Sequence, residues 1–113
     1  MIKPILTDKK QLRYVCESVL VSDSSEFISD LRDTAAQYTN LAGLAAPQIG
    51  HTVRIILVKV QAKTVVMINP EIIERKGKLV GGNEGCFSVP ASLKKPIMVR
   101  RSNKIRVQWD DEL

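Results

Sequence analysis

Metal-ligating and redox-active side chains are scarce in this chain of 113 residues, which contains one histidine and two cysteines. Two cysteines are too few for a framework of disulfides, and in the reducing cytosol both would be free thiols. The single histidine, His51, follows a glycine and has no second histidine four residues later. We therefore interpret His51 as a residue of a surface turn and not as a metal ligand.

Long apolar runs are also missing, because no segment approaches the ~20 apolar residues that span a bilayer. The first residues are too short and too broken a stretch for a signal peptide. The apolar fraction of 44% and the charged fraction of 26% are ordinary for a globular chain. The sequence therefore predicts one domain over residues 1–113, located in the cytoplasm and without a membrane partner.

Aromatic residues make up only 4% of the chain, whereas the net charge is +5. Much of that charge lies in one segment without acidic residues, here called the basic strip: Lys94, Lys95, Arg100, Arg101, Lys104 and Arg106. Two interpretations are open. The strip is either a solvated strand edge, whose charges discourage edge-to-edge pairing, or a patch for RNA or a ribosome surface. The lack of aromatic residues for base stacking favours the first.

Hydrophobic periodicity predicts one helix followed by several strands. Asp23 and Glu26 have the spacing of a capping box, and apolar residues then recur at helical spacing over residues 24–38. Stretches rich in β-branched residues predict strands at 53–60, 64–68, 97–101 and 104–109, with Pro70 ending the second. Residues 71–80 are also strand-like, with a turn or bulge at Gly77, and a loop follows at 81–83. This order indicates an α+β fold, with the N-terminal helix packed on antiparallel strands.

A run of small residues, Gly43-Leu44-Ala45-Ala46, leads into Pro47 and Gln48. Small side chains allow another backbone to come close, and proline stiffens the turn that follows. The side-chain amide of Gln48 is a neutral donor suited to stabilising a developing oxyanion. By itself the run favours a structural turn over a functional site.

A second run, Glu84-Gly85-Cys86-Phe87-Ser88, places a cysteine after a glycine. A thiolate is a good ligand for Zn²⁺ or Fe²⁺, whereas a nucleophilic role would require a neighbouring base for which the sequence offers no candidate. By itself the pattern favours a buried structural thiol at Cys86. Cys16, among its apolar neighbours, is interpreted in the same way.

Together the two runs resemble two of the three signature motifs of the peptide deformylases, metal-dependent hydrolases that remove the formyl group from the N-terminal methionine of new polypeptides. The resemblance covers nearly the whole chain, including Ile68-Asn69-Pro70-Glu71, and departs from the family at Leu41, where the family has glycine. It implies that Cys86 is a metal ligand and that Gln48 and the N–H of Phe87 hold the formyl oxygen. It also implies that the backbone of Gly43 and Leu44 lines the channel for N-formyl-methionyl peptides. The usual metal of the family is Fe²⁺, with Zn²⁺ or Ni²⁺ possible.

The third family motif, a helix carrying two histidines and a glutamate, has no counterpart in this sequence, so Cys86 is the only candidate ligand. We therefore expect a chain that is incomplete at its C-terminus, lacks the metal-binding helix and is inactive by itself. The alternative is a naturally shortened relative, kept as a peptide- or protein-binding module. We also expect apolar surface on the strands at 53–60 and 64–68, where the missing helix would pack, and self-association through it.

Overall fold

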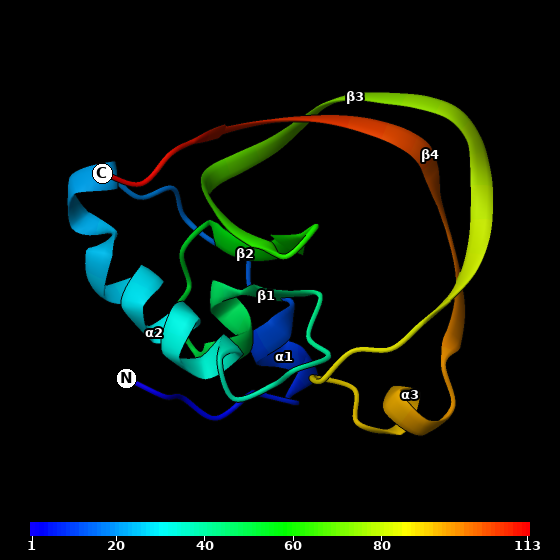
Figure 1. The fold of residues 1–113 in the computed structure, drawn as a ribbon, viewed down its shortest axis with the longest axis horizontal. Helices are drawn as coiled ribbons and strands as arrows, with labels where there is room; N and C mark the ends of the chain where they lie inside the picture. Colours follow the sequence, from blue (N-terminus) through cyan, green and yellow to red (C-terminus); the bar gives the residue numbers. More distant parts are fainter. The chain divides into compact units, whose positions relative to one another are not determined.

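The computed structural model describes residues 1–113, and its strands form one sheet in the order β1-β2-β3-β4 (Figure 1). The elements follow the chain as α1 (Lys9–Leu12), η1 (Val21–Asp23), α2 (Ser25–Ala35), β1 (Gly43–Ala45), η2 (Ala46–Ile49), β2 (Ile55–Val60), β3 (Lys63–Glu84), α3 (Ala91–Lys94) and β4 (Ile97–Asp110). The predicted α+β class, with the main helix packed on antiparallel strands, is confirmed.

Two units can be separated within the chain. The N-terminal unit comprises Met1–Pro70 and Trp109–Leu113, and the hairpin unit comprises Glu71–Gln108. All the buried apolar side chains belong to the N-terminal unit, between Ile28 and Ile68. The assignment of residues 1–113 to one domain stays a prediction.

The core of the N-terminal unit forms where α2 packs against β1 and β2 (Figure 1). Ile28, Leu31 and Ala35 recur at helical spacing and are buried along one face of α2. On the sheet, β2 pairs antiparallel with β3 so that Leu57 lies opposite Val66, and both are buried. The alternation of buried and half-buried residues along β2 is that of a strand with one face on the core.

The start of α2 differs from the predicted capping box. Asp23 ends the 3₁₀ helix η1, and the residue at the cap is Ser24, whose backbone is already helical (φ −94°, ψ −14°). The Ser24 hydroxyl donates to the carbonyl of Val21 (2.6 Å) and accepts no bond from the helix. Because the chain enters α2 directly from η1, no residue has the extended conformation that a capping side chain requires.

The turn between β2 and β3 lies where the sequence predicts it, although it contains no glycine. Gln61 (φ 48°) and Ala62 (φ 66°) are both left-handed, and Val60 pairs with Lys63 across them. Two left-handed residues match the twist of a tight hairpin, which explains why the conformation is adopted despite the two Cβ atoms.

Strand β3 joins the strands predicted at 64–68 and 71–80 and continues to Glu84, because neither Pro70 nor the glycines at 81 and 82 interrupt it. The interruption predicted in β4 at residues 102–103 is likewise absent. The irregularity predicted at Gly77 is present as a positive φ of 78° inside β3. A Cβ built on Gly77 would lie 3.0 Å from the Cβ of Asn103, so β3 and β4 approach closely there.

Asn69 connects β3 to the irregular segment before α2. Its φ is 52°, a left-handed value that asparagine tolerates better than most residues. The side-chain oxygen accepts from the N–H of Val19 (2.9 Å), and the side-chain nitrogen donates to the carbonyl of Val19 (2.8 Å). One amide therefore satisfies both backbone groups of a residue fifty positions away, as a neighbouring strand would.

Exposed apolar side chains occur mainly where the sequence does not predict them. On β2 and the first part of β3, only Val60 is a strongly exposed large apolar residue. The hairpin unit exposes many more: Ile72, Ile73, Leu79, Val80, Val89, Leu93, Ile97, Met98 and Ile105. The expectation of apolar surface on residues 53–60 and 64–68 stays a prediction: α2 packs on one face of β2, and the apolar residues of the other face are half exposed.

The two hydrogen bonds of Asn69 predict a graded loss of stability. Asn69→Gly keeps the left-handed backbone but leaves Val19 without its partners, which should cost about 1–3 kcal/mol of unfolding free energy. Asn69→Ala should cost about 1 kcal/mol more, because alanine is disfavoured at positive φ. Urea unfolding of both variants measures this, and equal stability of the alanine variant and the parent would contradict it.

Candidate active site

The first motif forms the edge of the sheet and the turn after it. Gly43 and Leu44 lie in β1, opposite Val58 and Leu57 of β2. A Cβ built on Gly43 would lie 3.0 Å from the carbonyl oxygen of Leu57, so glycine permits the close pairing of the two strands. The side chain of Leu44 is buried, so Leu44 can offer a bound peptide only its backbone.

Gln48 lies in the 3₁₀ helix η2, which begins directly after β1. Its side-chain oxygen Oε1 accepts a hydrogen bond from the N–H of Ala45 (2.9 Å), three residues earlier. Its backbone carbonyl accepts from the N–H of Leu6 (2.7 Å). Gly50 closes the turn with a left-handed φ of 90°. The orientation of the Gln48 amide is therefore set locally, with its nitrogen at the end opposite Ala45.

The second motif forms a tight loop in the hairpin unit, after the end of β3. Cys86 and Val89 form an isolated antiparallel bridge, and the N–H of Val89 donates to the carbonyl of Cys86 (2.9 Å). The loop holds Cys86 and Phe87 next to each other, with Cys86 exposed and Phe87 half-buried. The interpretation of Cys86 as a buried structural thiol is therefore wrong.

Ser92 stabilises this loop. Its hydroxyl oxygen accepts from the N–H of Cys86 (2.8 Å) and lies 2.6 Å from the carbonyl of Val89, to which it donates. Ser92 is one of the few buried polar residues, and a Cβ on Gly85 would lie 3.1 Å from its carbonyl oxygen. The glycine of the motif thus allows the chain to pass close to Ser92. Sequence reasoning missed Ser92 because nothing in its neighbourhood indicates a bond six residues back.

The glutamate that opens the second motif is paired with the next strand. Both oxygens of Glu84 accept from Arg101, from Nε (2.6 Å) and from a terminal nitrogen (2.6 Å). These hydrogen bonds lower the pKa of Glu84 and raise that of Arg101. A bidentate pair of this kind fixes direction as well as distance, so it ties the end of β3 to β4.

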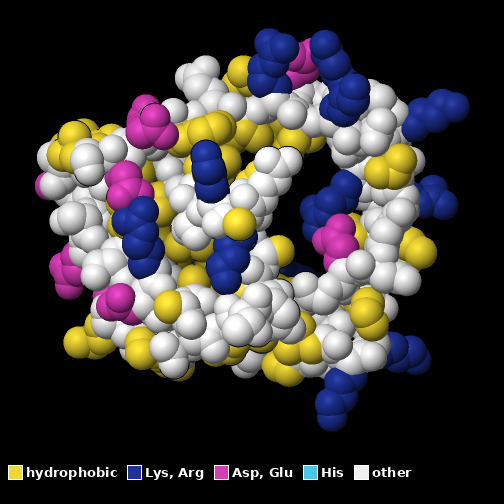
Figure 2. Space-filling model, viewed as in Figure 1, with side chains coloured by type: hydrophobic (Ala, Val, Ile, Leu, Met, Phe, Trp, Pro, Cys, Tyr) yellow, Lys and Arg dark blue, Asp and Glu magenta, His cyan; other side chains and the backbone are white.

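The basic strip is partly neutralised by such pairs. Figure 2 shows Lys and Arg side chains projecting from the β3–β4 hairpin. Within the strip, Arg101 is paired with Glu84, and Arg106 lies 3.6 Å from Glu74. These contacts support the interpretation as a solvated strand edge, since part of the charge is already engaged within the chain.

Metal-ligating residues do not cluster in this chain. No group of three or more His, Cys, Asp or Glu side chains is placed to hold a metal ion. His51 directly follows the turn at Gly50, and its side chain is 21% exposed: its Nε2 lies 2.7 Å from Asp30 and its ring packs edge-on against Phe27. Cys16 is half-buried, and burial raises the pKa of its thiol. Residues 1–113 therefore do not complete a metal site of three protein ligands.

A model of the polypeptide deformylases matches residues 2–113 of the sequence. The chain belongs to the polypeptide deformylase family. It is 39% identical over 109 residues to a peptide deformylase of Dictyoglomus thermophilum, a match that covers 96% of this chain and 65% of that protein. The chain thus spans less than two thirds of the length of this deformylase.

Solved deformylase structures have the same fold. The deformylase of Thermotoga maritima superimposes with a TM-score of 0.86 at 28% identity, over 98% of this chain and 75% of that one. A class I type b deformylase of Acinetobacter baumannii, crystallised with Met-Ala-Ser bound, gives a TM-score of 0.82 at 25% identity, over 96% and 77% of the two chains. Family membership implies a catalytic metal. None of the helices found here has the length and apolar character needed to cross a membrane.

The contacts of Ser92 predict a local effect of removing its hydroxyl. In Ser92→Ala the Cys86 N–H loses an acceptor, and a bond of this kind contributes about 1 kcal/mol. We expect hydrogen exchange at the Cys86 amide to become roughly fivefold faster. The matched control Ser102→Ala, a half-buried serine in β4 of the same unit, should leave this rate unchanged. Unchanged exchange in Ser92→Ala would mean that the hydroxyl does not order the loop.

Proposed function

We propose that residues 1–113 form the substrate-binding part of a peptide deformylase, which hydrolyses the formamide of N-formyl-methionyl peptides. The family match over residues 2–113 supports the reaction. The observation that carries the proposal is the anchored amide of Gln48 within the first motif. This anchoring supports a role as donor, because the bond from the Ala45 N–H to Oε1 fixes the orientation of the whole amide before a substrate binds.

In this proposal, Gln48 and the backbone N–H of Phe87 stabilise the negative charge that develops on the formyl oxygen. Donors held in place before the reaction stabilise such charge without the cost of reorientation. The short 3₁₀ turn and its bond to Leu6 support such a role for Gln48. The bridge between Cys86 and Val89 and the Ser92 hydroxyl support an ordered backbone around Phe87.

The peptide would bind through the backbone of Gly43 and Leu44. β1 is the edge strand of the sheet, and an extended peptide can add to such an edge through main-chain hydrogen bonds. The Acinetobacter baumannii deformylase is known with the tripeptide Met-Ala-Ser bound, which supports a short peptide as the ligand class. No observation favours the alternatives, a non-enzymatic binding module or a nucleic-acid binder.

The metal would be held in part by Cys86, which is exposed and in an ordered loop. Fe²⁺ is the metal we propose, with Zn²⁺ or Ni²⁺ as substitutes, and its other ligands would come from outside residues 1–113. Such a metal supplies an activated water when bound. We further propose action on new polypeptides in the cytoplasm, near the ribosome. Self-association would use the half-exposed apolar face of the strands at 53–60 and 64–68.

Substitutions at Gln48 test the proposed donor. The test uses a chimera in which residues 1–113 are followed by the remaining C-terminal part of the Dictyoglomus thermophilum relative, assayed by formate release. Gln48→Leu should lower turnover by about 10²–10³-fold, as loss of one oxyanion donor does. Gln48→Glu keeps an acceptor for the Ala45 N–H but has no donor, so it should lose as much.

The control for this series is Gln37→Leu, which changes an exposed glutamine after α2 and should leave turnover unchanged. Near-normal turnover in Gln48→Glu together with a loss in Gln48→Leu would show that Gln48 serves only the turn. Metal content should remain the same in all the variants.

Substitution of the two cysteines tests the proposed ligand. In the chimera, Cys86→Ala should abolish tight binding of Fe²⁺ or Zn²⁺, because three protein ligands are reduced to two, whereas Cys16→Ala should not. Metal analysis after dialysis measures this. Chains of residues 1–113 alone should release no formate. Equal metal content in the two alanine variants would refute the role of Cys86.

A further inference from the structure

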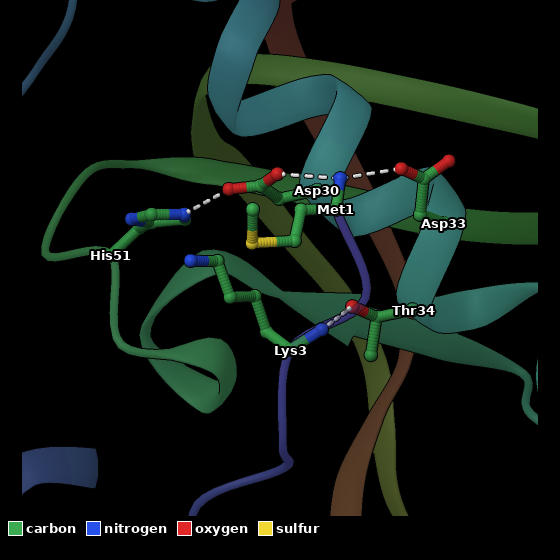
Figure 3. Close-up of polar contacts among 6 residues, drawn as sticks. All are labelled: Met1, Lys3, Asp30, Asp33, Thr34 and His51. Carbon is green, nitrogen blue, oxygen red and sulfur yellow. Dashed lines mark hydrogen bonds and ion pairs between the residues drawn. The ribbon is translucent and has the colours of Figure 1, made fainter.

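The α-amino group of Met1 is bound by two aspartates of α2. Its nitrogen lies 2.9 Å from Oδ1 of Asp30 and 2.5 Å from Oδ2 of Asp33 (Figure 3). The side chain of Asp30 is only 7% exposed, whereas that of Asp33 is 48% exposed. The ammonium group therefore bridges one buried and one exposed carboxylate.

Two further hydrogen bonds lie next to this ammonium–carboxylate contact, one at Asp30 and one at Thr34. The second oxygen of Asp30 lies 2.7 Å from Nε2 of His51, which donates to it, and the hydroxyl of Thr34 accepts from the N–H of Lys3 (2.9 Å). Asp30, Asp33 and Thr34 are at positions i, i+3 and i+4 of α2 and so share one face of the helix, as Figure 3 shows. The first three residues of the chain are thus held along one helical turn.

The charges of the site are mutually stabilised. The hydrogen bonds that the ammonium group donates to Asp33 and then to Asp30 raise the pKa of the Met1 amine. The ammonium group, followed by His51, lowers the pKa of Asp30, and the charge of Lys3 acts in the same direction. A buried carboxylate costs free energy unless it is paired, so the ammonium group offsets part of the cost of burying Asp30.

We propose that, in a chain that starts at Met1, Asp30 and Asp33 form a receptor for the α-ammonium group of Met1, so that the stability of the N-terminal unit depends on whether this amine is acylated. A formyl or acetyl group on the amine forms an amide. The amide carries no charge and has one N–H where the ammonium group has three. It can serve one carboxylate at most, so either Asp30 or Asp33 loses its bond to residue 1, and Asp30 then keeps only its bond to His51.

This inference does not depend on the proposed enzymatic activity. It requires only a chain that starts at Met1 and two carboxylates in the observed positions. Because Asp30 is buried and the Met1 amine is not, the energetic effect of acylation arises mainly at Asp30.

The test compares the 113-residue chain with a free amine, the same chain with a formylated or acetylated amine, and a chain extended by Gly-Ser before Met1. Acylation should lower the folded-to-unfolded equilibrium constant by roughly two- to tenfold in urea unfolding, the range for one ion pair with a partly buried partner. The extended chain should lose a similar factor, since its ammonium group is displaced by two residues.

A matched control is the Asp30→Asn, Asp33→Asn double variant, in which acylation should have no effect on unfolding. The same acylation effect in the parent and in the double variant would overturn the proposal, as would equal stability of the free and acylated parents.

A second readout keeps the test informative if the double variant folds poorly. The pKa of the amine, measured from the pH dependence of its acylation rate, should lie above its ordinary value of about 8 in the folded parent and fall in each single Asn variant. A raised amine pKa means that its contribution is present below about pH 8 and is lost as the pH rises through the folded-state value. The stability difference between free and acylated chains should therefore shrink at high pH, and an ordinary amine pKa in the parent would overturn the inference.

Discussion

The packing of α2 against the strands of the N-terminal unit is the contact on which the proposed substrate site depends. Leu31 and Ile55 are fully buried, and burying side chains of this size contributes roughly 1.5–3 kcal/mol each. This contact holds β2 in place, and β2 in turn holds β1 through the close approach at Gly43. The position of Gln48 follows, because η2 begins directly where β1 ends.

The hairpin unit is stabilised differently. None of its apolar side chains is buried, and its buried residues are the serines Ser88 and Ser92. Its order comes from strand pairing, from the Glu84–Arg101 pair and from the hydroxyl of Ser92. Elements with few buried apolar contacts open at lower free energy than a packed core. The loop that carries Cys86 therefore depends on polar contacts, whereas the turn that carries Gln48 depends on the apolar core.

Much of the fold could be predicted from the sequence, because α2 and β2 have strong hydrophobic periodicity and β-branched content. The bounds of β3 and β4 could not, because proline and glycine usually end strands. Here the side chain of Asn69, next to Pro70, bonds to the backbone N–H and carbonyl of Val19. Gly77 adopts a positive φ and remains within the strand. The motif residues could be found from their resemblance to the deformylases. Ser92 and Asp30 could not, because their roles arise from contacts between residues that no local pattern connects.

The hydrogen bond from Leu6 to Gln48 has a consequence beyond the geometry of the turn. Residues 1–6 are fixed at both ends, at one end by the helix that binds the Met1 amine and at the other by the carbonyl of Gln48. Pro4 stiffens the span between them. Two contacts that order one short tether are thermodynamically coupled, and the coupling is reciprocal. A stronger interaction between Met1 and α2 therefore also reduces the conformational freedom of the turn that carries the Gln48 amide.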